Sequence, residues 1–315
     1  MKSLLILALT LGSSVAVAVE AKNTKPTPVT IALNWKAEPE FGGFYEASIG
    51  GIYAKHGIDA KVQEGGSGTP TVQMLANGKV DFAIVSADEV VISQDRNPKN
   101  KVIALFAVYQ TAPYIIMTHA ERGFKNLRDV YLSEGTLSVQ AGLPYHQYLL
   151  QKFGKPKVQV VPYLGGVSNF LNDKKFSQQG FITIEPLAAQ KGGAKVQSFL
   201  ISDEGFNPYV VVLAAREETL KKNPELVKNV VEATRQGWQG YLKDPTKTNE
   251  HMAKLNKSLD LATFNEGAQI QKPLIEAKGQ ELGKMSIERW ETLIKQLKEL
   301  KQIKSSPNAQ DLFRP

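Results

Sequence analysis

The sequence predicts an α/β protein built as two lobes, each with a mostly parallel sheet flanked by helices. From Val29 to Ile201, short apolar runs alternate with segments of helical spacing, and the links between them are short. This alternation is typical of parallel sheets covered by helices. Removing an expected 21-residue leader from the 315 residues leaves 294, more than one hydrophobic core usually serves. Two lobes are therefore expected.

The expected strands are apolar runs bounded by Gly, Pro or polar residues. They lie near 29–35, 58–64, 81–86, 101–110, 113–119, 136–140, 158–163, 180–184, 196–201 and 209–216. Helical spacing dominates afterwards, with Pro224, Pro245 and Ser286 as start signals. The expected C-terminal helices lie near 217–222, 224–242, 246–256, 260–271 and 286–301.

Two short polar links that contain Pro are the expected crossings between the lobes. Residues 109–113 and 205–209 each join one apolar strand to the next. If the chain crosses at both, lobe 1 is discontinuous, 29–111 plus 208–315, and lobe 2 is the insert 112–207. Paired crossings allow two lobes to close about a ligand.

The first 21 residues have the features of a secretory signal peptide. One Lys precedes an apolar run, and small residues lead to an Ala-x-Ala site, with cleavage after Ala18 or Ala21. The run is shorter than the roughly 20 residues that span a bilayer. The chain has no Cys, so neither disulfides nor a lipid anchor on Cys is expected. We therefore expect a periplasmic protein that is not a lipoprotein and has no stable membrane insertion.

Charge and motif spacing favour a binding protein over an enzyme or a nucleic-acid partner. The net charge is +7, but Lys alternates with Glu in the C-terminal third, which is typical of a solvated helix face. The four His residues lack metal-ligand spacing, and there is no Gly-x-Ser-x-Gly elbow. We expect no catalytic residue, no metal, no cofactor and no nucleic acid.

The loop after strand 58–64 reads Gly-Gly-Ser-Gly-Thr-Pro-Thr and is the strongest local motif. Thr69 as N-cap and Pro70 as first helical residue would direct backbone N–H groups outward from a positive helix end. An ordinary βα turn is the alternative. The candidate ligand-binding residues of this loop are Gly66, Ser67, Gly68 and Thr69.

Aromatic residues follow the first strand. Trp35, Phe41 and Tyr45 lie in a glycine-rich segment that can present a flat face to a planar ligand. Phe44 and Tyr45 are adjacent, so at least one of them is expected in the core. Trp238 and Trp290 lie inside long amphipathic patterns and are expected to be core residues.

Carboxylates stand at two expected helix starts. Ser86 and Glu89 have the spacing of a capping box, which leaves Asp88 either to cap a helix or to reach a ligand amine. Glu185 directly follows an apolar strand and precedes Pro186. It would either meet a bound cation or amino group, or act as a first-turn acid favoured by the helix dipole.

Several of these motifs, taken in order, resemble the NMT1/THI5-like substrate-binding proteins of ABC importers, related to thiamine-pyrimidine precursor binding and to pyrimidine synthase. The resemblance is strongest over 29–120. The motifs are Asn34-Trp35, Gly42-Gly43-Phe44-Tyr45-x-Ala47, Gly51-x-Tyr53-x-x-x-Gly57-Ile58, the Gly65–Thr69 loop, Gly78-x-Val80-Asp81-Phe82 with Asp88, Leu127-Arg128-Asp129, Tyr163-Leu164-Gly165-Gly166, Glu185-Pro186 and Asn223-Pro224-Glu225-Leu226-Val227. It implies the type II periplasmic binding protein fold with two interlobe crossings. It also implies a monomer that delivers its small-molecule ligand to an importer permease and its ATPase.

In the pyrimidine binders of this family, aromatic side chains sandwich a flat ring and a carboxylate meets its amino group. The resemblance implies these roles for Trp35, for Tyr109 or Tyr163, and for Glu185, with Asn169 in the same second-lobe junction as Tyr163. The relative that makes the pyrimidine carries a cysteine-rich motif, which is absent here.

These observations favour a non-catalytic receptor for a small planar nitrogen heterocycle, foremost a thiamine pyrimidine precursor. Nitrate, taurine or an alkanesulfonate is the alternative, since the glycine loop also suits an anion. An exported enzyme acting on a related heterocycle is the alternative from another class.

Overall fold

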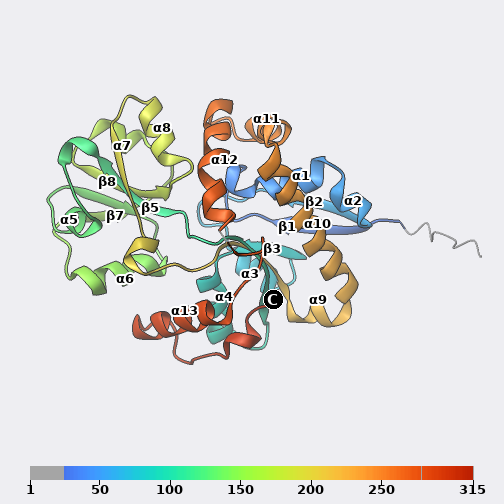
Figure 1. Cartoon of the computed structure of the whole chain (residues 1–315). Coiled ribbons are helices and arrows are strands. Elements are labelled where there is room, and N and C mark those ends of the chain that lie inside the picture. Colours follow the sequence, from blue (N-terminus) through green and yellow to red (C-terminus); the bar gives the residue numbers. More distant parts are fainter. Residues whose placement is uncertain (1–24, 278, 315) are drawn as a thin grey trace, which may run out of the picture.

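The computed structural model describes residues 25–277 and 279–314, which form two α/β lobes (Figure 1). The predicted fold class is confirmed. The expected signal peptide lies outside the described residues. Within the described part of the chain, no helix is both long enough and apolar enough to cross a bilayer.

The first lobe contains a five-stranded sheet in the order β2-β1-β3-β10-β4. β1 runs parallel to β2 and β3, whereas β10 is antiparallel to β3 and β4. The strands are β1 (Thr27–Ala32), β2 (Ile58–Gln63), β3 (Phe82–Val85), β4 (Val102–Tyr109) and β10 (Val210–Arg216).

The second lobe repeats this plan in the order β7-β6-β8-β5-β9. β6 is parallel to β7 and β8, whereas β5 is antiparallel to β8 and β9. Each sheet is therefore mixed, and its parallel share is smaller than the sequence predicts. The strands are β5 (Tyr114–His119), β6 (Thr136–Val139), β7 (Gln159–Pro162), β8 (Phe176–Phe181) and β9 (Val196–Leu200).

Helices flank both sheets, and the boundaries of the lobes at 111/112 and 207/208 stay a prediction. The first-lobe helices are η1 (Pro39–Phe41), α1 (Gly42–Ile49), α2 (Ile52–Lys55), α3 (Thr71–Ala76), α4 (Ala87–Arg96), α9 (Glu217–Lys222), α10 (Pro224–Lys243), α11 (Thr246–Leu255), α12 (Leu261–Ile275), α13 (Ile287–Glu299) and η4 (Ala309–Asp311). The second-lobe helices are η2 (Ala120–Arg122), α5 (Leu127–Tyr131), α6 (Pro144–Phe153), α7 (Ser168–Asn172), α8 (Glu185–Lys191) and η3 (Ser202–Glu204).

Two local expectations are corrected. The strand expected at 180–184 is β8, which begins at Phe176 instead. The sequence does not predict its first half as a strand, because Ser177, Gln178 and Gln179 are polar, but all three are buried in the structure. Thr69 does not cap α3; its hydroxyl instead accepts a hydrogen bond from the Gly66 N–H at 2.8 Å, within the loop. The capping box of Ser86 and Glu89 is confirmed.

Close contact between α1 and α10 builds the core that lies behind the first strand. A Cβ added at Gly237 would lie 2.3 Å from the Gly43 carbonyl oxygen, so the two backbones touch. The Phe44 and Trp238 rings pack edge to face, with centroids 5.9 Å apart. Trp238 and Trp290 are both fully buried, as predicted.

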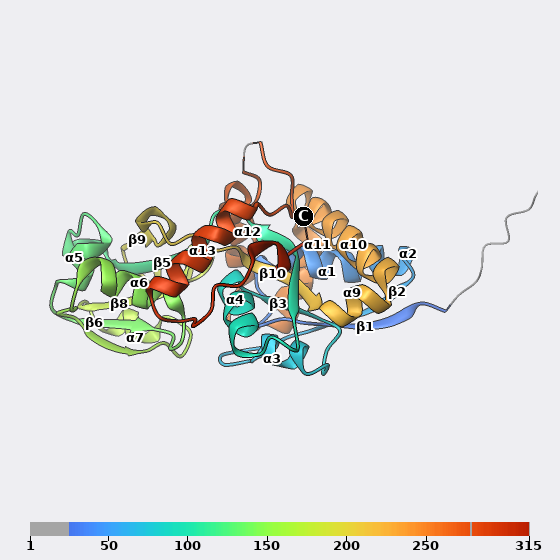
Figure 2. The ribbon, with the colours of Figure 1, turned by 90° about the horizontal axis from the view of Figure 1, so that it is seen from below.

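Arg289 of α13 joins the two links through which the chain passes between the sheets. Its guanidinium donates to the Gln110 carbonyl of the first link at 2.6 Å and to the Asn207 and Pro208 carbonyls of the second at 2.7 and 2.9 Å. It also lies 3.9 Å from the centre of the Tyr209 ring. Figure 2 shows α13 extending past the links toward α6 of the second lobe.

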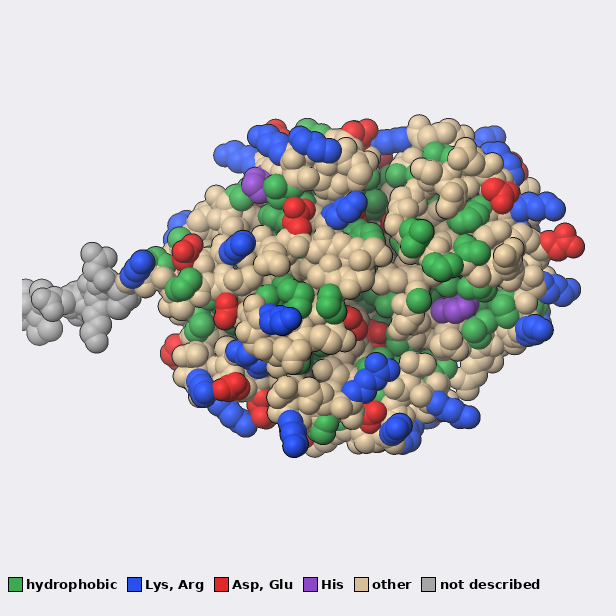
Figure 3. All heavy atoms as spheres, turned by 180° about the vertical axis from the view of Figure 1, so that it is seen from behind, with side chains coloured by type: hydrophobic (Ala, Val, Ile, Leu, Met, Phe, Trp, Pro, Cys, Tyr) green, Lys and Arg blue, Asp and Glu red, His purple; other side chains and the backbone are tan. Residues whose placement is uncertain are grey.

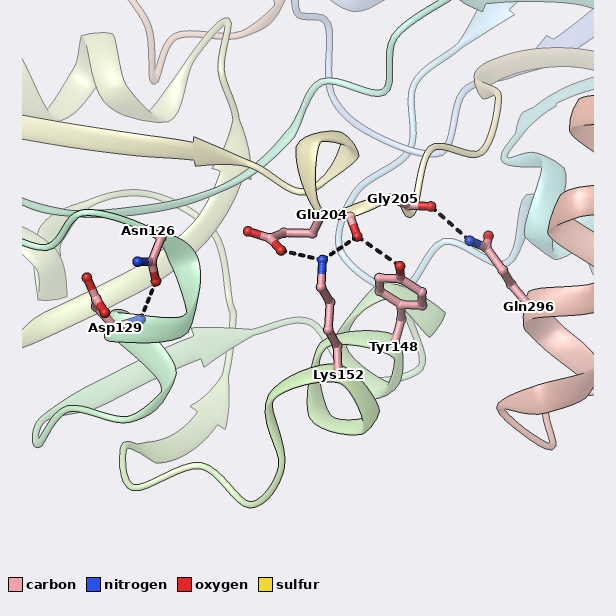
Figure 4. Close-up of polar contacts among 7 residues, drawn as sticks. All are labelled: Asn126, Asp129, Tyr148, Lys152, Glu204, Gly205 and Gln296. Carbon is pink, nitrogen blue, oxygen red and sulfur yellow. Dashed lines mark hydrogen bonds and ion pairs between the residues drawn. The ribbon is translucent and has the colours of Figure 1, made fainter.

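Further contacts fix the second link next to η3 (Figure 4). The Glu204 carbonyl oxygen accepts hydrogen bonds from the Tyr148 hydroxyl and the Lys152 ammonium of α6, each at 2.8 Å. One residue further on, the Gly205 carbonyl accepts from the Gln296 amide of α13 at 2.8 Å. The link is therefore held by one helix from each lobe.

Arg289→Met is expected to lower the free energy of unfolding by about 1–2 kcal/mol, because three carbonyl oxygens lose a charged donor at a site that water can partly reach. Lys295→Met in the exposed part of the same helix serves as the control and should stay within about 0.5 kcal/mol of the wild type. Urea unfolding followed by circular dichroism measures both. Equal stability of the two variants would mean that Arg289 does not tie the links together.

Candidate functional site

A cavity that is connected to solvent lies between the two lobes. The first lobe contributes the segment after β1, the glycine loop, the start of α4 and the start of β10. The second lobe contributes β5, the ends of β6, β7 and β8, and the start of α8. The lining residues are Asn34, Trp35, Glu38, Glu40, Phe41, Gly68, Thr69, Ser86, Glu89, Tyr114, Gln140, Leu143, Tyr163, Gln179, Gly180, Phe181, Glu185, Val210 and Val211.

Aromatic side chains form the walls of this cavity. Trp35 of the first lobe faces the loop after β7, since a Cβ added at Gly165 would lie 3.8 Å from the edge of the indole. On the second lobe, Tyr114 and Phe181 pack edge to face with centroids 5.1 Å apart. Flat rings on both lobes suit a planar ligand between them.

Glu185 is held at the end of β8 by two hydrogen bonds. Its carboxylate accepts from the Tyr163 hydroxyl at 2.7 Å and from the Phe181 N–H at 2.7 Å. Gly180 permits this placement, because a Cβ there would lie 2.8 Å from the glutamate side chain. Burial raises the pKa of Glu185, and these hydrogen bonds lower it in part.

Glu38 and Glu40 flank Pro39 and enter the cavity from the first lobe. They are buried, with 7% and 3% of their surface exposed. The Trp35 indole N–H and the Asn256 amide donate to one Glu38 oxygen at 3.3 and 3.4 Å. Burial, then the charges of Glu40 and Glu185, raises the pKa of Glu38 well above its usual value.

A fourth carboxyl group comes from Glu89 at the start of α4. It accepts hydrogen bonds from the Ser86 backbone N–H at 2.9 Å and from the Ser86 hydroxyl at 3.1 Å. Burial and the charge of Asp88 raise the pKa of Glu89 to about 7. Across the cavity, the Gln179 side-chain oxygen accepts from the Gln140 N–H at 2.5 Å and from the Tyr145 hydroxyl.

The cavity is acidic. Among the described residues that line it, four are Glu and none is Lys, Arg or His. Basic side chains lie outside: on the face seen in Figure 3, Lys and Arg are interspersed with Asp and Glu over both lobes. Within the described residues, no group of three or more His, Cys, Asp or Glu has an arrangement that could hold a metal ion.

Half of the candidate residues predicted from the sequence lie at this cavity: Trp35, Phe41, Gly68, Thr69, Tyr163 and Glu185. The other half do not line it. Tyr45 packs on His251, Tyr109 donates to the Gln271 side-chain oxygen at 2.6 Å, and Asp88 is buried in the first turn of α4. Gly66, Ser67 and Asn169 lie in the flanking loop and helix, outside the lining.

Sequence reasoning missed Glu38, Glu40 and Glu89 as lining residues, and also the glutamines. The capping box accounts for Glu89 in the sequence, but in the structure the Glu89 carboxyl group both completes the capping box and lines the cavity. Glu38 and Glu40 lie in a segment without periodicity, where acidic residues are usually exposed. The Glu-Pro-Glu-Phe run, which begins three residues after Trp35, was the available signal.

The ligand-free protein is expected to lose stability between about pH 5 and pH 8. Burial, together with the charge of Glu185, raises the pKa of Glu40 from 4.5 to about 8. The folded state therefore keeps this carboxyl protonated over a range in which the unfolded chain has ionised it. The resulting stability is fully present below pH 4.5 and is lost as the pH rises through 8. Glu89, with a pKa of about 7, acts in the same direction.

Thermal unfolding midpoints at pH 5, 6, 7 and 8 measure this dependence, with ionic strength held constant. Glu40→Gln should flatten the curve, and Glu250→Gln on the exposed face of α11 should leave it unchanged. A midpoint that rises toward pH 8 in the wild type would contradict the assignment.

Two α/β lobes, paired links and a cavity between them define the periplasmic binding protein fold. The aliphatic sulphonate binding protein SsuA from Escherichia coli has this fold, with a TM-score of 0.70 and 13% identity over 92% of this chain and 93% of that one. So does the desulfurization enzyme DSZB, with a TM-score of 0.61 and 13% identity over 90% and 96% of the two chains.

Residues 38–248 match the family model described as NMT1/THI5 like, and the chain belongs to this family. A relative within reach of sequence comparison is the riboflavin-binding protein RibY of Chloroflexus aurantiacus. It is 24% identical over 238 residues, which are 72% of this chain and 67% of the relative.

Proposed function

We propose that this chain is a non-catalytic solute-binding protein for a small planar nitrogen heterocycle, with a thiamine pyrimidine precursor as the leading ligand. One observation carries the proposal: the cavity between the lobes combines aromatic walls with carboxyl groups, and none of its described lining residues is basic. An aromatic ring with exocyclic or ring N–H donors matches both features.

The proposed binding mode uses both lobes. Trp35 stacks on one face of the ring, and the rings of Phe181 and Tyr114 close the second side. Glu185 accepts from an amino group while Tyr163 and the Phe181 N–H hold its carboxylate in place. Binding groups on both sides of the cavity favour a closed arrangement of the lobes when the ligand is present.

The anion alternative has less support. Nitrate and sulfonates carry a permanent negative charge, and four carboxyl groups would surround them without a cation. Two backbone N–H groups of the glycine loop already have partners within the loop. The Gly66 N–H donates to the Thr69 hydroxyl, and the Thr69 N–H donates to the Gly66 carbonyl at 3.0 Å. The likeness to SsuA therefore supports the fold and not its ligand.

The relative named for riboflavin supports the wider ligand class, since riboflavin also contains a planar nitrogen heterocycle. As for an enzyme, DSZB shares the fold, but no observation at this cavity favours a particular reaction. We further propose a periplasmic monomer that delivers its ligand to an ABC importer permease and its ATPase.

Isothermal titration with the hydroxymethyl and aminomethyl forms of the thiamine pyrimidine, riboflavin, taurine and nitrate tests the ligand class. We expect at least one pyrimidine to bind with Kd below about 10 µM, and no measurable heat from the anions. Saturable binding of an anion alone would refute the proposal. Chromatography of the ligand after overnight incubation tests for catalysis, and it should be recovered unchanged.

A further inference from the structure

Glu40 has an unusual position for a glutamate. Only 3% of its surface is exposed, and it lines the cavity between the lobes. Among the described residues, its Oε2 atom has no hydrogen-bond partner. A buried carboxyl oxygen without a hydrogen-bond partner is costly and rarely kept in a fold. The missing donor is therefore expected from outside the chain.

Within residues 25–277 and 279–314, the neighbours of Glu40 are acids and neutral donors, and none is a cation. Glu38 is on the same segment, and Glu185 lies close enough for its charge to raise the pKa of both first-lobe glutamates. Groups from the other packed elements are the hydroxyls of Tyr109, Tyr163 and Tyr241, the Asn256 amide and the Trp35 indole. The Trp35 and Asn256 donors both go to Glu38, whose side chain also lies within hydrogen-bond reach of the Glu40 side chain. No donor among the described residues reaches Glu40 Oε2.

Two hydrogen bonds from distant residues hold the backbone segment that carries Glu38 and Glu40. The Gln271 side chain of α12 donates to the Pro39 carbonyl at 2.9 Å, and the Asn256 amide donates to the Ala37 carbonyl at 3.1 Å. Both residues lie far along the chain from the segment that they hold. Glu38 and Glu40 thus enter the cavity from a backbone that is anchored on either side.

We propose that Glu38 and Glu40 form a cation subsite in the first lobe, which takes a positively charged nitrogen group of the ligand, such as a primary ammonium or an amidinium. The proposal rests on the proposed function, because it places the ligand in the same cavity, and it narrows the ligand to heterocycles that carry a positive charge. Glu185 then binds a separate donor at the second lobe. A neutral ring would leave Glu40 Oε2 unpaired and would bind more weakly.

Two ligand pairs that differ mainly in charge test the subsite by isothermal titration. The aminomethyl form of the thiamine pyrimidine is compared with its neutral hydroxymethyl form, and benzamidine is compared with benzamide. We expect each cation to bind at least tenfold more tightly than its neutral partner. Glu40→Gln should reduce this preference to less than threefold, because the cation loses the carboxyl group that pairs with it. Glu250→Gln on the exposed face of α11 should behave as the wild type.

The outcomes separate the two proposals. Equal binding of the charged and neutral pyrimidines overturns the subsite and leaves the proposed function in place. If neither pyrimidine binds, the proposed function fails. The comparison of benzamidine with benzamide then tests the subsite separately, and equal binding of the two compounds overturns it. If Glu40→Gln does not fold, Glu38→Gln replaces it, and an unchanged preference for the cation in that variant also overturns the subsite.

Discussion

Glu185→Ala is expected to weaken binding of the pyrimidine about 30- to 150-fold, which corresponds to about 2–3 kcal/mol. The substitution removes the proposed acceptor for the ligand amino group. It also leaves the Tyr163 hydroxyl and the Phe181 N–H, both 2.7 Å from the carboxylate, without their partner. Isothermal titration at constant pH and ionic strength measures the change.

Two control variants separate the loss of a contact from general damage. Glu185→Gln keeps one acceptor oxygen and nearly the same shape, so it should bind with an affinity between those of the wild type and Glu185→Ala. Glu204→Gln changes a second-lobe glutamate that contacts Lys152 outside the cavity, and its affinity should equal that of the wild type. Wild-type affinity in Glu185→Ala would show that the ligand does not reach this residue.

Gly237→Ala is expected to lower the free energy of unfolding by about 3 kcal/mol or more, the largest effect on stability that we predict. The added methyl would lie 2.3 Å from the Gly43 carbonyl oxygen and 2.6 Å from the Ala47 Cβ. Neither atom moves unless α1 separates from α10, and α1 directly follows η1, which carries Glu40. Urea unfolding measures the loss.

Gly240→Ala in the same helix is the matched control. Its added methyl would have its nearest contact at 3.2 Å, with the flexible side chain of Glu46. Because Ala is a better helix former than Gly, this variant should equal the wild type or exceed it by up to about 1 kcal/mol. Equal stability of Gly237→Ala and Gly240→Ala would contradict the close packing of α1 on α10.

Three of the six residues that the sequence correctly predicts at the cavity come soon after a strand. Trp35 follows β1, Tyr163 follows β7 and Glu185 comes shortly after β8. The ends of parallel neighbours meet at one edge of a sheet, so their position can be inferred without knowing the packing. The same reasoning gave the two-lobed fold class from the alternation of strands and helices.

Contacts between distant segments were beyond this reasoning. Tyr109 also lies at the end of a strand, but its hydroxyl donates a hydrogen bond to the side chain of Gln271 in α12, 162 positions further along the chain, and Tyr109 does not line the cavity. Tyr45 and its neighbour Phe44 are both buried, because α10 and α11 cover α1 on two sides. Glu38 and Glu40 are buried by α12 and by the second lobe. These contacts come from distant parts of the chain, so the sequence around residues 38–40 does not predict the burial.

Native mass spectrometry of protein purified without refolding tests the central claim most directly. We expect a complex with one copy of a nitrogen heterocycle that carries a positive charge, either co-purified or formed on addition of the aminomethyl pyrimidine. Release of a sulfonate or nitrate, or no heterocycle bound at saturating concentration, would contradict it.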